Sequence, residues 1–167
     1  MLDDNQLRDV VREVFDRFEQ FFASREGLYA YHCINEVQDV SRLTMHMNGL
    51  EVQINAIKHS KVKHHHLTDM TSVILDGGYT WFLQQQGATS PLEMHAAPGS
   101  IVRMGPNDEH WIPETSKPPS ISMCVFENQT YWHQHYTSLN DLSAGIIIGR
   151  AIGGLKRFID RQQFNWQ

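Results

Sequence analysis

The feature that most constrains this chain is a series of short β-rich runs, each closed by turn residues, between Leu43 and Tyr136. Val, Ile, Thr, Tyr, Phe and Trp recur in these runs, and pairs such as Asn48-Gly49 and Gly77-Gly78 separate them. Eight strands are predicted, at residues 43–47, 50–57, 64–75, 79–85, 100–104, 110–112, 121–127 and 130–136. Strands this short and this evenly spaced are typical of a β-sandwich or barrel.

Helical patterns flank the β region on both sides. From Leu7 to Phe22 the apolar residues recur every three or four positions, which predicts an amphipathic helix over residues 3–24, with Asp3 and Gln6 as a capping box. A second helix is predicted over residues 138–162. We interpret residues 1–167 as one domain, in which the two helices flank a β region at residues 43–136.

The C-terminal helical segment has an unusual row of glycines. Gly145, Gly149 and Gly153 repeat every fourth residue, so one side of this helix has almost no side chains. Such a face can approach another backbone closely, and we expect it to pack against the barrel or a second subunit. A membrane-surface helix is the alternative interpretation.

Charge and cysteine content exclude several classes of protein. The formal net charge is -5 and no long basic run occurs, so nucleic acid is not an expected partner. Cys33 and Cys124 are too few for a disulfide-stapled fold. The chain has no apolar stretch of about 18 residues and does not open as a signal peptide does. A soluble, cytoplasmic protein with a small-molecule substrate is expected, and no membrane partner.

Two of the ten histidines have a spacing that suggests chemistry. His64 and His66 lie two residues apart at the start of the predicted strand 64–75, where alternation places both side chains on one face. That arrangement is half of a metal site. The intervening His65 is expected to point to the opposite face.

Two segments resemble the paired motifs of the cupin superfamily. The stretch from His64 to Gly77 is similar to the first motif, and "GSIVRMGPNDEH", from Gly99 to His110, is similar to the second in its full length. More narrowly, "HHHLTDMTSVILDGGY" resembles a group of small bacterial and phage cupins without a settled function. The resemblance implies a mainly β double-stranded β-helix (jelly-roll) barrel and a metal site of His64, His66 and His110.

One departure from the cupin pattern changes the expected metal site. Met70 stands where the commonest cupin site has a glutamate ligand, and a thioether is a poor ligand for a hard divalent ion. Asp69 alternates to the other side and would need a bulge to reach the metal. The remaining three-His set resembles that of thiol dioxygenases in the cupin superfamily. It implies one divalent transition metal, with Fe(II) favoured and Zn, Ni, Mn or Cu as alternatives.

The resemblance favours an Fe(II) dioxygenase that acts on a small molecule inside the barrel. Two other functions stay open, a non-catalytic cupin that senses a ligand or metal, and a redox-neutral metal-dependent isomerase or lyase. Cupins often pair, and a homodimer through the barrel edge or the glycine-rich helix is expected. The candidate substrate-pocket residues are Met70, Ser72, Arg42, Arg103, His133 and His135.

Overall fold

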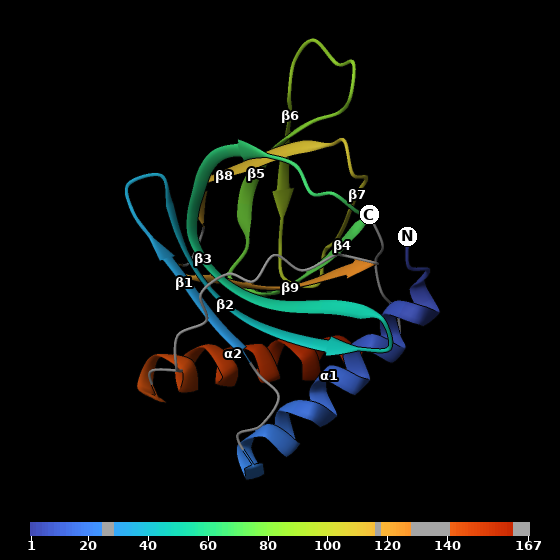
Figure 1. The fold of residues 1–167 in the computed structure, drawn as a ribbon, viewed down its shortest axis with the longest axis vertical. Helices are drawn as coiled ribbons and strands as arrows, with labels where there is room; N and C mark the ends of the chain where they lie inside the picture. The colour runs from blue at the N-terminus through green and yellow to red at the C-terminus, as the bar shows by residue number, and fades with distance from the viewer. Residues whose placement is uncertain (25–28, 116–117, 128–140, 162–167) are drawn as a thin grey trace.

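A computed structural model describes residues 1–24, 29–115, 118–127 and 141–161 of the chain (Figure 1). In it, one helix precedes a series of antiparallel β-strands and another helix follows them. The elements are α1 (Asp4–Ser24), β1 (Tyr29–Ile34), β2 (Gln38–Met47), β3 (Leu50–His64), β4 (Met70–Asp76), β5 (Tyr79–Gln84), β6 (Leu92–Ala96), β7 (Ile101–Met104), β8 (Glu109–Thr115), β9 (Ser120–Glu127) and α2 (Asp141–Asp160).

The strands form an antiparallel, nearly closed barrel whose order is β6-β5-β8-β3-β9-β4-β7, with β2 and then β1 added beside β3. The long strand β3 connects the two halves. Its first part, Leu50 to Ile57, pairs with β9, and its last part, Ser60 to His64, pairs with β8, with a register shift between Ser60 and His64. A strand that changes partners in this way turns the corner between two sheets, which closes a jelly roll.

Alternation along β3 divides its side chains between two environments. Val52 and Ile54 are fully buried on the outer face, under the helices. Gln53 and Asn55 are also buried, yet they point into the barrel lumen. Successive side chains of a strand point to opposite faces, so one strand supports both the helix-covered core and the interior of the barrel.

Both helices cover the outer face of the barrel and contact each other (Figure 1). The core that they form with the sheet includes Val11, Val14 and Phe18 from α1, and Ile148 and Leu155 from α2. The expected capping box is present at the start of α1. The Asp3 amide donates to Gln6 Oε1 and the Gln6 amide donates to Asp3 Oδ1, each at 2.9 Å.

The close approach expected of α2 occurs at a different glycine. A Cβ at Gly154 would lie 2.6 Å from both the Cβ and the carbonyl oxygen of Leu75 in β4. At Gly149 a Cβ would meet no heavy atom of the described residues within 4 Å, and at Gly153 only a guanidinium nitrogen of Arg157, 3.4 Å away. The row at Gly149 and Gly153 therefore does not face the barrel. The homodimer stays a prediction.

One predicted strand needs correction, and two strands of the structure were not predicted. The predicted strand 64–75 is two strands, because β3 ends at His64, residues 65–69 form a connection, and β4 begins at Met70. Strands β1 and β6 were not predicted; β6 (Leu92–Ala96) contains no β-branched or aromatic residue to mark it. The predicted strand 130–136 lies outside the described residues.

Within the described part of the chain, neither helix has the length and apolar character that crossing a bilayer requires.

Candidate metal centre

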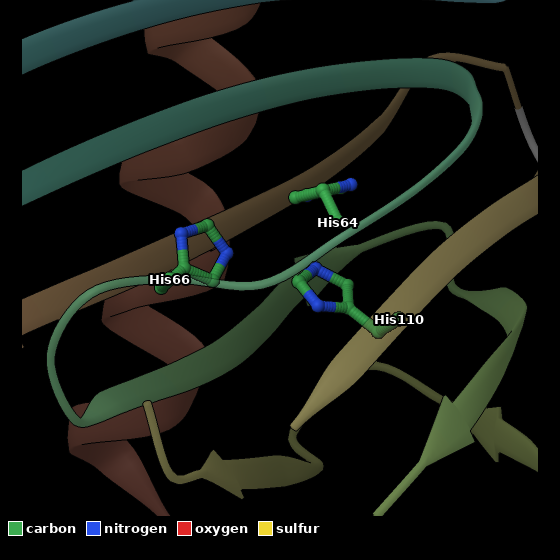
Figure 2. A group of neighbouring side chains, drawn as sticks. All are labelled: His64, His66 and His110. Atoms are coloured by element: carbon green, nitrogen blue, oxygen red, sulfur yellow. The ribbon is translucent and has the colours of Figure 1, made fainter. Parts of the chain in front are cut away.

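Three imidazoles converge at one end of the barrel lumen (Figure 2). His64, the last residue of β3, is the direct cross-strand partner of His110 in β8, and His66 reaches them from the connection between β3 and β4. One nitrogen of each ring lies within 4.8 Å of those of the other two. Among the described residues, no other group of three or more His, Cys, Asp or Glu side chains is arranged to hold an ion.

The three histidines meet for a reason other than the one expected from the sequence. Alternation on a single strand was the argument for His64 and His66, but His66 lies beyond the end of β3. The pairing of β3 with β8 instead brings His64 beside His110, and the turn after β3 folds His66 back over them. His65 is exposed and lies outside the cluster.

Burial keeps two of these imidazoles neutral. It lowers the pKa of His110 to about 2, with the neighbouring His64 and His66 adding to the effect. Burial likewise lowers the pKa of His66 to about 3, helped by His64 and by the positive charge of Arg42. A neutral imidazole has a lone pair to donate to a metal, so no proton has to be displaced at pH 7.

The hydrogen bonds of the rings fit metal ligation. His64 Nδ1 lies 2.8 Å from the carbonyl oxygen of Val62 and donates its proton to it. The lone pair of Nε2 is then available to bind a metal. Buried His110 Nδ1 has no hydrogen-bond partner among the described residues. Buried imidazole nitrogens that serve only structure are normally hydrogen-bonded, so this orphaned atom favours a ligand role.

The spacing of the rings also fits an ion after a small adjustment. The ring centroids are 4.3 Å apart for His64 and His110, 5.0 Å for His66 and His110, and 5.4 Å for His64 and His66. Metal–nitrogen bonds of about 2.1 Å place neighbouring ligand nitrogens about 3 Å apart. The ligand nitrogens, which lie within 4.8 Å of one another, therefore have to approach by up to about 2 Å to bind one ion.

Apolar side chains lie beside the three histidines on the side of the lumen. Met70, which stands at the position of the cupin glutamate ligand, is buried and lines the lumen beside the histidines. The ring of Phe126 lies 4.9 Å from that of His66, and Trp81 lies 6.2 Å from His110. The carboxylate of Asp69 lies 3.2 Å from the backbone nitrogen of Met1, away from the cluster. No carboxylate of the described residues joins the three-His set.

A cavity of about 60 Å³ continues from the histidines into the barrel. Its wall contains a chain of polar contacts across four neighbouring strands. Arg42 Nε donates to Asn55 Oδ1 at 2.7 Å, and Asn55 Nδ2 donates to Cys124 Sγ at 3.3 Å. The Cys124 thiol donates to Ser72 Oγ at 3.4 Å, and burial raises its pKa. Burial also raises the pKa of Tyr79, so both groups stay protonated at neutral pH.

Some of the expected pocket residues line the cavity and others do not. Met70, Ser72 and Arg42 line the cavity. Arg103 does not, because it lies on the outward face of β7, where its Nη2 donates to Asp4 Oδ1 at 2.7 Å and thus holds the start of α1. Its neighbours Val102 and Met104, which alternate to the other face of β7, line the lumen instead. His133 and His135 lie outside the described residues.

A polar face inside the barrel was not predicted from the sequence. Gln53 and Asn55 alternate with Val52 and Ile54, and this pattern was sufficient to predict a strand with a polar side. Alternation alone does not tell which side faces solvent, and polar residues usually do. Here the helices cover the apolar side, and the polar side faces the lumen.

Comparison with known proteins supports the fold and goes no further. No family model and no curated protein matches the sequence. Solved structures that are similar include the Fe(II) form of HppE with the alternative substrate (S)-1-HPP, at 9% identity and a TM-score of 0.50, covering 59% of this chain and 55% of that chain. A second HppE structure, with FeII and substrate, gives 10% identity and a TM-score of 0.50 over 61% of this chain and 57% of that chain.

A third similar structure is the capsular polysaccharide assembling protein CapF from Staphylococcus aureus, at 12% identity and a TM-score of 0.47, with 59% of this chain and 30% of that chain covered. This chain thus spans little more than half the length of the HppE chains that it matches. At such low identities the likeness concerns the fold alone. The strand order, the two flanking helices and the HppE likeness together identify the fold as a cupin-type jelly-roll barrel with an N-terminal and a C-terminal helix.

Proposed function

We propose that this protein is a metal-dependent oxidoreductase that holds one divalent transition metal, Fe(II), on His64, His66 and His110 and acts as a dioxygenase on a small molecule in the barrel. The observation that carries the proposal is the composition of the site. It has three converging imidazoles, two of them kept neutral by burial, and no carboxylate ligand among the described residues. Three protein ligands leave about half of an octahedral coordination sphere open.

The rest of the cavity favours redox chemistry over acid–base chemistry. An isomerase or lyase needs a side chain that takes up a proton near the metal. Among the described residues that line the cavity there is no Asp, Glu or Lys, and the Tyr79 and Cys124 pKa values are raised. Fe(II) with open coordination sites would itself supply the activation of dioxygen. The protein's part is to hold the ligands, orient the substrate and exclude bulk water.

The similar fold of HppE in its Fe(II) form adds support for iron, as an analogy between folds. Three imidazoles also suit zinc, nickel, manganese and copper to different degrees, so the metal has to be measured. A metal-dependent isomerase or a ligand sensor on the same site would retain its function without dioxygen. Dependence on dioxygen therefore separates these functions.

The test combines metal content with oxygen consumption. The protein is produced without added metal, analysed for bound metals, reloaded anaerobically with Fe(II), and assayed for oxygen uptake with candidate thiols and phenols. A His110→Ala variant removes a direct ligand, so it is expected to lose more metal affinity than the about 10- to 100-fold that loss of a ligand's hydrogen-bond partner costs. The matched control is His95→Ala, because His95 is exposed on β6 and lies outside the cluster.

Two results would contradict the proposal. One is wild-type protein that binds none of the candidate metals in any preparation. The other is turnover that persists without dioxygen when zinc or nickel replaces iron, which would assign a redox-neutral reaction to the same site.

A further inference from the structure

The barrel is open along one side, between β6 and β7. These strands stand at the two ends of the strand order, and in the described structure β6 pairs with β5, β7 pairs with β4, and no ladder joins β6 to β7. Yet they are consecutive in the chain, with only residues 97–100 between them. Consecutive strands with so short a connection commonly pair as a hairpin. Their separation therefore needs a physical cause.

The turn between the two strands supplies that cause. The Ser100 amide donates to the Ala97 carbonyl oxygen at 2.9 Å, with Pro98 and Gly99 in the central positions. The φ of Gly99 is 90°, which is the conformation of a type II turn. Such a turn splays the strands that it joins. The Gly99 amide also donates to the carbonyl oxygen of Ile74 at 2.7 Å, so β7 leaves the turn beside β4 and away from β6.

A groove of about 270 Å³ lies between the diverging strands, and we call it the side groove. Its apolar lining comes from β5, β6 and β7 and consists of Trp81, Leu83, Met94, Ala96 and Val102. Met94 is the cross-strand partner of Trp81 and shares its inward face, yet it is 38% exposed. A cavity of roughly 150 Å³ is sufficient for benzene, so the side groove has room for a molecule of two rings.

The side groove is continuous with the lumen beside the three histidines. Trp81 and Val102 line both spaces, and the Trp81 ring lies 6.2 Å from that of His110. The lumen cavity, at about 60 Å³, accommodates only a few non-hydrogen atoms, and the side groove is the larger space next to it. This continuity indicates that the occupant of the groove is a small molecule that also reaches the lumen.

The lining also indicates the charge of that molecule. Two residues of the side groove have ionisable side chains, Arg103 and His95, and both already have partners. Arg103 Nη2 donates to Asp4 Oδ1 at 2.7 Å, and His95 Nδ1 lies 3.0 Å from Thr80 Oγ1. The remaining walls are mainly apolar. Burial of a charge without a partner is costly, so an uncharged group is the complementary occupant.

We propose that the side groove binds the uncharged, apolar part of a small molecule, an aromatic or aliphatic group of one or two rings, whose other end passes Trp81 towards His110. That this molecule is the substrate rests on the proposed function. Binding in the groove itself requires no metal, and it is tested on metal-free protein.

The methionine methyl groups report separately on the parts of the molecule involved. Met94 lines the side groove, Met104 lines the lumen, and Met123 lies in the core under the helices. The metal-free full chain, labelled with ¹³C at the methionine methyl groups, is titrated with indole, a neutral two-ring probe, and followed by NMR. Saturable shifts are expected at Met94 and Met104, with none at Met123. Indole-5-carboxylate, the same ring with a charge, is expected to bind at least about tenfold more weakly.

Variants on β6 assign the binding to the groove. Met94→Lys places a charge in the groove, so the shift of Met104 is expected to require at least about tenfold more indole. Met94→Leu, which keeps the apolar lining, is expected to bind indole as the wild type does. The matched control is Leu92→Lys, because Leu92 lies on the same strand, is 53% exposed and does not line the groove. An unchanged Met123 signal shows that each variant is folded.

Four results would overturn the inference. They are the absence of a saturable shift at Met94, a Met104 shift that needs no more indole in Met94→Lys than in the wild type, equal binding of indole-5-carboxylate, and occupation of the groove by a second copy of the chain. The last would appear as a Met94 signal that moves with protein concentration without probe, together with a dimer in sedimentation. Metal content is measured independently, so failure of the metal proposal leaves the indole result unaffected.

Discussion

Replacement of Gly154 by alanine is expected to destabilise the protein, although alanine is the better helix former. An added Cβ would lie 2.6 Å from the Leu75 Cβ, 2.6 Å from its carbonyl oxygen and 2.9 Å from its carbonyl carbon. Two of these atoms belong to the backbone of β4, which cannot rotate away as a side chain does. Helix α2 or strand β4 must therefore shift.

The expected change in the free energy of unfolding is the difference between a gain in helix propensity and a cost of overpacking. Alanine in place of glycine inside a helix contributes about 1 kcal/mol of stability. Overpacking a close-packed contact typically costs about 1–3 kcal/mol, and the contact with backbone places Gly154→Ala at the upper end of that range. The expected net loss in the free energy of unfolding is about 1–2 kcal/mol.

The same helix offers the matched control. Gly149→Ala adds a Cβ that meets no described heavy atom within 4 Å, so only the helix-propensity gain of about 1 kcal/mol is expected. The two substitutions are chemically identical and lie five residues apart, yet the predicted changes have opposite signs. Urea denaturation with equal m values measures both. If Gly154→Ala were as stabilising as Gly149→Ala, the packing of α2 on β4 described above would be refuted.

Other predictions concern the lumen. Because the pKa of His66 is lowered to about 3 and that of His110 to about 2, the unfolded chain binds protons below pH 6.5 that the native state does not. The free energy of unfolding of metal-free protein should fall as the pH decreases from 6.5 towards 3, by roughly 1 kcal/mol per histidine between pH 7.5 and pH 5.5. Denaturation curves at pH 7.5 and pH 5.5 measure this change, and an equal free energy of unfolding at both pH values would contradict the prediction. Cys124 is buried with a raised pKa, so in a Cys33→Ser background its thiol should react with Ellman's reagent about a hundredfold more slowly in native than in denatured protein. Comparable rates in the two states would show that the thiol is accessible.

Much of the architecture could be predicted from local patterns. The 3.6-residue periodicity of residues 3–24 and the Asp3–Gln6 capping box correspond to helix α1, which begins at Asp4 and ends at Ser24. Turn pairs such as Asn48-Gly49, where both residues have positive φ, correctly mark the break between β2 and β3. These signals are readable because they depend on residues close together in the sequence.

Elements whose signal is weak or non-local were predicted incorrectly. Nothing in Leu92–Ala96 favours a strand by composition, and β6 exists because its backbone pairs with β5. The single strand predicted over residues 64–75 is interrupted at residues 65–69, where β3 leaves its partner β8 and the chain returns as β4. Pairing with other strands decided both cases, and the propensity of the residues did not.

For the three histidines, too, the sequence predicted which residues take part, and the tertiary structure decided that they meet. Their identity was predicted from motif spacing, and the cupin resemblance added His110 to the pair His64 and His66. That the rings meet is a consequence of the register between β3 and β8, which places His64 opposite His110, forty-six positions later in the chain. No local pattern contains that register.

By itself, the sequence determined the flanking helices, most of the strands and the residues with metal-ligand chemistry, since each depends on residue type and short-range spacing. Only the tertiary structure decided which face of each strand is the inside. The helices bury the apolar side of β3 and leave Gln53 and Asn55 facing the lumen, while Arg103 is turned outward to Asp4 and Arg42 inward to the cavity. The physical reason is that alternation defines two faces of a strand, but only packing against other elements gives each face its environment.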